Sequence, residues 1–297
     1  MKTIITGASG FVGQNLSQYL SNFSFSITPI SLRNSNWKDN FDGDAIIHLA
    51  GKAHDTKNTS EASEYFKVNT DLTKELFDAF LVSDIKDFIY FSSVKAAADN
   101  VLGILYEDTP TSPKTPYGQS KLKAEEYILQ KNIPKGKRVF IIRPCMIHGP
   151  GNKGNLNLLY QLVSKGLPWP LGDFENKRSF LSIENLCFVI KELLENTSIS
   201  SGVYQLADDE YLSTNQLIFL LGKSLGKRTK IWKINASFIR LIASIGDKIY
   251  LPLNSERLQK LTENYVVSNE KIVKALGKQL PVKASEGLLR TFNSFGA

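Results

Sequence analysis

The sequence contains few of the residues that build disulfide or metal sites. Of its 297 residues only two are cysteines, Cys145 and Cys187, and only three are histidines, His48, His54 and His148. Two cysteines cannot form a disulfide framework or the repeated spacing of a zinc site. No paired carboxylates accompany the histidines in the pattern of a metal site. We therefore expect no metal and no structural disulfide.

Long hydrophobic runs are also missing. No apolar run reaches the roughly 20 residues that are needed to cross a bilayer. The first six residues lead directly into a glycine loop, so we expect no signal peptide. Residues 238–253 are apolar but interrupted by Arg240, Asp247 and Lys248. This pattern predicts an amphipathic helix, with docking on a membrane surface as the alternative. We expect a cytoplasmic protein without a membrane partner.

The positive charge is spread along the chain. The formal net charge is +7, from 36 Lys and Arg against 29 Asp and Glu. The densest cationic stretch, residues 223–233, is short, which argues against a nucleic-acid partner. A positive balance also suits an anionic small substrate. The length of 297 residues is enough for one large domain or two coupled lobes.

Strand and helix signals alternate through the first half of the chain. Strand signals lie at residues 2–6, 26–32, 44–49, 87–91 and 139–142, and helical patterns at residues 11–22, 60–82 and 120–130. This alternation predicts an α/β fold with a doubly wound parallel sheet covered on both faces. We expect a Rossmann-type domain over residues 1–150.

The pattern changes after residue 150. Residues 149–155 are rich in glycine and asparagine, which indicates a loop. Helical patterns follow at residues 156–165, 183–196 and 214–225, with short extended pieces such as 202–207 between them. We expect a smaller, mostly helical substrate-binding lobe over residues 151–297, some segments of which return to the sheet.

Three glycines stand where the first strand meets the first helix. Gly7, Gly10 and Gly13 would permit a sharp turn, let backbone N–H groups approach a pyrophosphate, and allow close packing of helix on strand. The helix N-terminus would then face the phosphates. Three glycines can also simply make a turn. Their position directly after an apolar strand favours dinucleotide binding.

A second pattern carries hydroxyl and ammonium groups. Tyr117 and Lys121 are four residues apart, so they project from one face of a helix. The lysine charge would lower the tyrosine pKa. The tyrosine could then exchange a proton with an alcohol while hydride moves to or from a nicotinamide. The same spacing also occurs by chance in helices. Ser92 and Ser93 follow the strand at 87–91, where a hydroxyl can bond a reacting oxygen or merely cap a turn.

Together these motifs resemble the short-chain dehydrogenase/reductase superfamily, in its extended NAD-dependent epimerase/dehydratase branch. Residues 6–13, with the spacing GxxGxxG, are similar to the N-terminal motif of that branch. Further similar segments are residues 48–51, 68–70, 143–144, 148–151, 178–185 and 286–288. The resemblance covers nearly the whole chain and keeps the motifs in order.

The resemblance implies a role for each matching residue. The catalytic residues would be Ser93, favoured over Ser92, with Tyr117 and Lys121. The cofactor would be bound by Gly7, Ser9, Gly10, Phe11, Val12, Gly13, Arg33, Leu49, Ala50, Gly51, Asn69, Tyr117, Lys121 and Pro144. A nucleoside-diphosphate sugar, expected to be UDP-linked, would contact Ser93, Lys95, Asn155, Arg178 and Arg257. For Arg257, a solvated surface charge is the equal alternative.

Three departures from the family pattern bear on the reaction. Val94 and Lys95 stand where sugar 4,6-dehydratases have an acidic pair, and a lysine cannot replace a carboxylic acid at a comparable pKa. The second strand ends without the acidic residue that binds the ribose of NAD. Ser31 and Arg33 can receive a 2′-phosphate there, which favours NADP(H), with NAD(H) as the alternative. Met146 replaces an asparagine found in sugar 4-epimerases and cannot donate its hydrogen bond.

These details most resemble 4-ketoreductases of bacterial polysaccharide pathways such as O-antigen and capsule biosynthesis. We therefore expect NADPH-dependent reduction of a UDP-4-keto-6-deoxy-N-acetylhexosamine (UDP-4-keto-6-deoxy-HexNAc). The first alternative is a UDP-hexose 4-epimerase with tightly bound NAD. The second is a non-catalytic NADP-sensing or RNA-binding relative, which would not need Ser93, Tyr117 and Lys121 together. The resemblance also implies a homodimer formed by the helices at 60–82 and 120–130, with a monomer left open.

Overall fold

The computed structural model describes residues 1–34, 36–52, 61–152, 154–249 and 254–296. Its centre is a six-stranded parallel sheet with the order β2-β1-β3-β4-β6-β9. The strands are β1 (Lys2–Thr6), β2 (Ser26–Ile30), β3 (Ala45–His48), β4 (Asp87–Phe91), β6 (Arg138–Pro144) and β9 (Gly202–Leu206). Because β2 and β3 lie on opposite sides of β1, the sheet is doubly wound, as the alternating signals predict.

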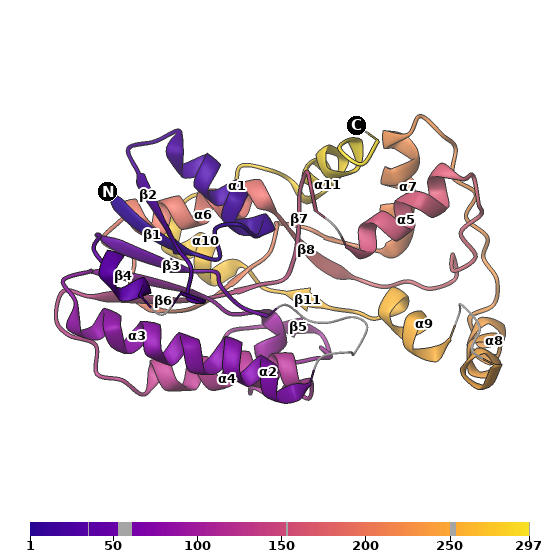
Figure 1. Ribbon diagram of the computed structural model, residues 1–297. Coiled ribbons are helices and arrows are strands. Elements are labelled where there is room, and N and C mark those ends of the chain that lie inside the picture. Colours follow the sequence, from indigo (N-terminus) through magenta and orange to yellow (C-terminus); the bar gives the residue numbers. More distant parts are fainter. Residues whose placement is uncertain (35, 53–60, 153, 250–253, 297) are drawn as a thin grey trace.

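Helices cover both faces of this sheet (Figure 1). One face carries α1 (Phe11–Ser21), α6 (Ile183–Glu195) and α10 (Glu270–Leu276), and the other carries α3 (Leu72–Val82) and α4 (Pro116–Leu129). Ile5 packs in the cluster on the first face and its neighbour Ile4 in the cluster on the second. Successive strand residues point to opposite faces, so a strand covered on both sides must be apolar throughout.

The helical pattern expected over residues 60–82 forms three connected pieces. The described part consists of α2 (Ala62–Phe66), a π-helical turn (Lys67–Asp71) and α3. The π-helical turn buries Asn69 and Thr70 against α4, where Thr70 Oγ1 donates a hydrogen bond to the Ser120 backbone oxygen at 2.8 Å. Such wide turns often occur at functional sites. Residue 60, the expected start of this helix, and His54 lie outside the described residues.

Most of the chain after residue 150 forms a second lobe. Its helices are α5 (Asn155–Ser164), α7 (Thr214–Ser224), α8 (Ala236–Ile249), α9 (Ser255–Thr262) and α11 (Ala284–Asn293). Its small sheet has the order β10 (Tyr211–Leu212), β8 (Arg178–Ser182), β7 (Met146–His148). A separate core fills this lobe, with Trp169, Phe180 and Leu221 among its buried residues. β11 (Val266–Val267) pairs with β5 (Ile104–Leu105), which ties the lobe to the loop after β4.

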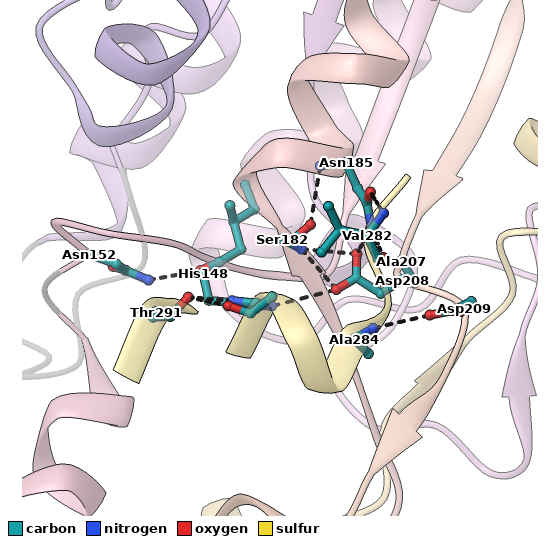
Figure 2. A network of polar contacts seen from close by, with 12 residues as sticks. His148, Asn152, Ser182, Asn185, Ala207, Asp208, Asp209, Val282, Ala284 and Thr291 are labelled. Carbon is teal, nitrogen blue, oxygen red and sulfur yellow. Dashed lines mark hydrogen bonds and ion pairs between the residues drawn. The ribbon is translucent and has the colours of Figure 1, made fainter. Parts of the chain in front are cut away.

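A buried polar network joins the two lobes (Figure 2). The Asp208 carboxylate, which follows β9, accepts hydrogen bonds from the Ser182 backbone nitrogen at 3.0 Å and from Asn185 Nδ2 at 2.7 Å. The same carboxylate lies 3.5 Å from His148 Nε2. His148 Nδ1 in turn lies 2.9 Å from Thr291 Oγ1 on α11. The network therefore holds α11 against the ends of β7, β8 and β9.

Within the described ranges, none of the helices is both long and apolar enough to cross a membrane.

Candidate active site

The glycine loop after β1 lies where the strand order reverses. Gly7 has φ +72°, in the left-handed region that favours glycine. A Cβ at this position would lie 2.7 Å from the Ala50 backbone nitrogen, in the loop after β3. Leu49 in that loop donates its N–H to the Thr6 carbonyl oxygen at 3.1 Å. The loops after β1 and β3 thus meet at the switch point, where open α/β sheets bind ligands.

The start of α1 provides backbone donors beside this loop. Gly10 is the N-cap and has no side chain to satisfy the first N–H groups of the helix. Such groups, together with the helix dipole, attract phosphate. Gly13 lets the helix approach the loop, because a Cβ there would lie 2.4 Å from the Gly7 oxygen. The remaining loop residues predicted to contact the cofactor, Ser9, Phe11 and Val12, are exposed or half-buried.

The loop after β3 borders the predicted catalytic lysine. A Cβ on Gly51 would lie 2.9 Å from Asn69 Oδ1 and 3.1 Å from Lys121 Nζ. Asn69 fixes this loop, because its Oδ1 accepts from the Lys52 backbone nitrogen at 2.7 Å and its Nδ2 donates to the Lys52 oxygen at 3.1 Å. The glycine therefore leaves a cradle over Asn69 and Lys121. These residues fit a dinucleotide that extends from the glycine loop to α4.

Two serines follow β4, and their side chains have different partners. Ser92 Oγ donates a hydrogen bond to Glu125, which is fully buried and pairs with Arg143 (Nη2 to Oε2, 2.5 Å). Ser93 Oγ instead accepts a hydrogen bond from the Lys95 backbone nitrogen at 3.2 Å, and it lies near enough to Tyr117 to oppose the rise of the tyrosine pKa. Ser92 therefore belongs to a buried scaffold between α4 and β6. Ser93, the serine favoured by the resemblance, is the one that faces the tyrosine.

The N-terminus of α4 positions Tyr117. The helix begins at Pro116, earlier than the expected residue 120, because Thr115 caps it and a proline suits the first helical position. Thr115 Oγ1 accepts from the Gly118 backbone nitrogen at 3.2 Å. A Cβ on Gly118 would lie 2.4 Å from the Lys95 carbonyl oxygen. Glycine therefore lets α4 approach the segment after Ser93.

Burial determines the protonation of the tyrosine and the lysine. Burial raises the pKa of Tyr117, and the hydrogen bond with Ser93 opposes this shift. Burial lowers the pKa of Lys121 to about 8, and Glu125 opposes this shift. The expected lowering of the Tyr117 pKa by Lys121 is not found. The ammonium group points to the Phe91 carbonyl oxygen, 2.8 Å away. Tyr117 is thus a neutral phenol that can donate a proton.

A chain of hydrogen bonds under the site was not predicted from the sequence. The Ala50 backbone nitrogen donates to Thr6 Oγ1 at 3.2 Å, and Thr6 Oγ1 lies 2.7 Å from His48 Nδ1. His48 Nε2 lies 2.8 Å from Thr73 Oγ1, which donates to the Asn69 carbonyl oxygen at 2.8 Å. Burial lowers the pKa of His48 to about 3, so the ring is neutral. The chain connects the ends of β1 and β3 to the π-helical turn.

These hydrogen bonds continue from Asn69 to α4, the helix that carries Tyr117. Asn69 Nδ2 donates to Ser120 Oγ at 3.0 Å, and Ser120 Oγ donates to the Tyr117 carbonyl oxygen at 2.8 Å. The loop after β3 and Tyr117 are therefore held by one polar network. The apolar patterns of β3 and α3 predict that these polar residues are buried. Such patterns do not predict which hydrogen bonds the buried residues form.

The end of β2 is the region expected to bind the adenosine ribose. Ile30 is buried, and Ser31 and Arg33 are exposed in the turn that follows. A hollow of about 140 Å³ opens here, with Ser31, Asn34 and Trp37 among its lining residues. None of the described residues that line it is acidic. At the far side of the site, Pro144 ends β6 and is buried beside β9.

Lys95, predicted to contact substrate, lies at the boundary of the lobes. Its Nζ donates to the Asp99 carbonyl oxygen at 2.8 Å and lies 4.3 Å from the centroid of the Tyr265 ring. Burial lowers the pKa of Lys95, and the nearby Glu263 opposes this shift. Tyr265 and Glu263 were not predicted as site residues, because they are far from Lys95 in the sequence.

Arg178 at the start of β8 reaches the same region. Its Nη1 donates to the Lys260 carbonyl oxygen at 2.7 Å, and its Nη2 lies 3.7 Å from Glu263 Oε1. Burial lowers the pKa of Arg178, and Glu263 opposes this shift. The structure thus brings Lys95 and Arg178 together around Glu263. The two cations and the Glu263 carboxylate leave one net positive charge, which favours an anionic ligand at this boundary.

The other two predicted substrate residues are separate from that pair. Arg257 is exposed on α9, and its backbone nitrogen is capped by Asn254 Oδ1 at 2.9 Å. Asn155 begins α5, and its side chain lies outside the described parts of the structure. Both remain predictions. Within the part of the chain that the structure describes, no group of three or more His, Cys, Asp or Glu is arranged to hold a metal ion.

The fold and the site define a class of enzyme with a Rossmann-type nucleotide site and a Ser, Tyr and Lys group at the sheet edge. Residues 3–207 match the model of the NAD dependent epimerase/dehydratase family. The chain belongs to this family.

Several characterised proteins are similar over most of their length. A UDP-glucose 4-epimerase of Vibrio cholerae is 30% identical, over 98% of this chain and 94% of the relative. An N-acetyl-alpha-D-glucosaminyl-diphospho-ditrans,octacis-undecaprenol 4-epimerase of Escherichia coli O157:H7 is 28% identical, over 97% of this chain and 93% of the relative. A GDP-6-deoxy-D-mannose reductase of Pseudomonas aeruginosa is 28% identical, over 74% of this chain and 79% of the relative.

Solved structures share the fold across the full chain. The RMD protein of Pseudomonas aeruginosa, complexed with NADPH, has a TM-score of 0.76 at 23% identity, and 99% of this chain and 98% of that chain are covered. A UDP-glucuronic acid 4-epimerase of Bacillus cereus, in complex with NAD, has a TM-score of 0.77 at 21% identity, with 100% and 99% covered. These likenesses support the fold and leave the choice between NAD and NADP open.

Proposed function

We propose that the protein is an NADPH-dependent 4-ketoreductase that acts on a UDP-4-keto-6-deoxy-HexNAc in polysaccharide biosynthesis. The observation that carries the proposal is the end of β2, where Ser31 and Arg33 are exposed beside a hollow without an acidic lining residue. An arginine can form charge-assisted hydrogen bonds with a 2′-phosphate, which NADP has and NAD does not. A reductase must exchange its reduced cofactor at every turnover, which suits NADPH.

A nucleoside-diphosphate sugar fits the other end of the site. Lys95 and Arg178 are two cations at the lobe boundary, and a diphosphate carries the opposite charge. The relatives from Vibrio cholerae and Pseudomonas aeruginosa are named as acting on UDP-glucose and a GDP-sugar. Val94 and Lys95 provide no acidic pair for the elimination of water, which favours reduction over dehydration.

Tyr117, Ser93 and Lys121 have different roles in the reduction. Bound NADPH supplies the hydride. Tyr117, a neutral phenol because burial raises its pKa, donates a proton to O4 of the sugar. Ser93, whose side chain lies near Tyr117, orients the ketone oxygen. Lys121, charged below about pH 8, stabilises the phenolate left on Tyr117 and binds the ribose beside Gly51.

A second candidate function is a UDP-hexose 4-epimerase with tightly bound NAD. It is favoured by the two 4-epimerases that resemble this chain over 98% and 97% of its length. Met146 opposes it, since a thioether cannot donate the hydrogen bond of the asparagine in sugar 4-epimerases. The same Tyr117 and Lys121 would serve both reactions, so the candidates differ chiefly in the cofactor and its exchange.

The experiment that tests the proposal begins with release and identification of any bound nucleotide. The purified protein then receives NADPH and a panel of nucleotide 4-keto sugars, including UDP-4-keto-6-deoxy-HexNAc, and the NADPH absorbance is followed. Oxidation of NADPH with that substrate supports the reductase. Co-purified NAD, together with interconversion of UDP-hexoses without added cofactor, would establish the epimerase instead.

Assembly and location belong to the same proposal. We expect a homodimer formed through α3 and α4, and a cytoplasmic location. Light scattering of the purified protein measures the first, and cell fractionation measures the second.

A further inference from the structure

Helix α8 has two apolar faces, and its own lobe uses only one of them. Ile239 and Ala243 are buried in the core of the lobe together with Leu258 of α9. A second stripe points outward, where Phe238, Leu241 and Ile245 are 55%, 57% and 47% exposed. Their spacing of three and four residues places them on one side of the helix. A helix that packs on one side needs only one apolar face, so the fold does not account for this stripe.

The stripe lies at an extremity of the molecule. Figure 1 shows α8 at the far end of the second lobe from the central sheet, with α9 beside it. The two helices are tied by Asp247, whose carboxylate accepts from the Ser255 backbone nitrogen at 2.9 Å and from Ser255 Oγ at 2.6 Å. The only acidic side chain of α8 is therefore engaged with α9. The outward stripe is fixed in place and accessible.

Most of the net charge of the protein lies in α8 and in the segment that leads into it from α7. Residues 223–248 contain seven Lys and Arg and one acidic residue, a net charge of +6 out of +7 for the whole chain. Arg240 and Lys248 lie on α8 itself, and Lys230 and Lys233 are exposed in the segment just before it. Lys223, Lys227 and Arg228 lie at or just after the end of α7. An exposed apolar stripe flanked by cations combines the two features of helices that lie in the interface of an anionic membrane.

We propose that α8 docks the protein onto an anionic lipid bilayer, with Phe238, Leu241 and Ile245 inserted among the lipids and the flanking cations against the head groups. The positive charge near α8 favours an anionic membrane over a second copy of the chain. A second copy of the chain would bring another cationic segment to the same face, and the two would repel each other. Nucleic acid would match the charge but would leave the apolar side chains of Leu241 and Ile245 exposed to water. The docking is independent of the proposed reaction.

The test is co-sedimentation of the full-length protein with vesicles. Vesicles of phosphatidylglycerol and phosphatidylethanolamine should bind the protein, and neutral phosphatidylcholine vesicles should bind it weakly. Phe238→Ser/Leu241→Ser/Ile245→Ser should lower the partition coefficient at least roughly tenfold, because insertion of three apolar side chains is lost. Lys230→Gln/Lys233→Gln/Lys248→Gln should lower it by roughly fivefold per charge at low salt.

The matched control removes exposed apolar side chains elsewhere. Leu158 and Phe219 are 65% and 62% exposed and lie on α5 and α7, away from the helices of the proposed dimer. Leu158→Ser/Phe219→Ser should leave vesicle binding unchanged. Circular dichroism verifies that each variant is folded. Equal vesicle binding by the wild type and by Phe238→Ser/Leu241→Ser/Ile245→Ser would overturn the proposal. The proposal would also be overturned if this variant converted a dimer to a monomer, or if it lost binding to RNA and the wild type did not bind vesicles.

Discussion

The ammonium nitrogen of Lys121 lies 2.8 Å from the carbonyl oxygen of Phe91. This contact joins α4 to the last residue of β4, immediately before the two serines. The lysine therefore lies at the carboxyl edge of the sheet, close to the loop at Gly51 and on the helix that carries Tyr117. The geometry places a charged group, a phenol and a serine hydroxyl together beside the loop that follows β3.

Replacing the phenol should remove catalysis and leave the fold intact. For Tyr117→Phe we expect kcat to fall by about 10²- to 10⁴-fold, the usual contribution of a positioned general acid. Tyr127→Phe is the matched control on the same helix, since its hydroxyl bonds Asp78 at 2.8 Å on the outer side. Steady-state kinetics of both variants provide the measurement. Wild-type turnover by Tyr117→Phe would remove this residue from the mechanism.

The pH dependence of reduction should report Lys121. Its pKa is lowered to about 8 by burial, so the side chain is charged below that pH and neutral above it. We expect kcat/KM for the ketone to decline as the pH rises through about 8. Full activity up to pH 10 would show that the charge of Lys121 is not required. Lys121→Met should abolish the pH-dependent limb together with most of the activity.

Arg33 should set the preference between the two cofactors. Hydrogen bonds to a charged group contribute about 1.5 to 3 kcal/mol, so Arg33→Gln should raise KM for NADPH by roughly 10- to 100-fold. KM for NADH should hardly change, which provides an internal control. Lys38→Gln, a nearby exposed cation, is the matched variant. An equal rise of KM for both cofactors would indicate a general effect on binding and contradict the 2′-phosphate assignment.

His48 should make the protein less stable in acid. Its folded pKa is about 3, below the ordinary 6.5, so between these values the unfolded chain binds a proton that the folded chain does not. The free energy of unfolding therefore falls as the pH drops from 6.5 toward 3. Between pH 7.5 and 5 this should amount to about 2 kcal/mol. Urea unfolding of His48→Gln should show a shallower decline, and an identical slope would contradict the assignment.

The network between the lobes should depend on Asp208. Its buried carboxylate accepts three hydrogen bonds and lies beside His148. Asp208→Ala should lower the free energy of unfolding by about 3 kcal/mol, because the buried partners lose their acceptor. The neighbouring Asp209 is exposed and accepts one backbone hydrogen bond at 3.2 Å. Asp209→Ala should cost under about 1 kcal/mol. Urea unfolding compares them, and equal losses would contradict the role of the network.

Local patterns are sufficient to predict the central sheet. The strands predicted at residues 2–6 and 87–91 match β1 and β4, and the others differ from the structure by one or two residues at an end. These segments are predictable because buried parallel strands are continuous apolar runs between turns. The glycine loop and the Tyr117 and Lys121 pair were also visible, because their spacing lies within one turn or one loop.

What the sequence did not indicate depends on contacts between distant segments. The π-helical turn at Asn69 has no periodicity that distinguishes it from α-helix. The pairing of Lys95 with Tyr265 joins segments far apart in the chain, and no spacing rule connects them. The direction of the Tyr117 pKa was predicted wrongly because the burial of the phenol, the larger effect, is visible only in the folded structure.

The central claim is that hydride from exchangeable NADPH enters the sugar at C4 while Tyr117 supplies the proton. The most direct measurement uses NADPH deuterated at the transferred position, with UDP-4-keto-6-deoxy-HexNAc as substrate and mass spectrometry of the product. The wild-type product should contain one deuterium at C4, and Tyr117→Phe should form almost no product. Sugar products that form without deuterium, through a bound cofactor that returns its own hydride, would contradict this mechanism.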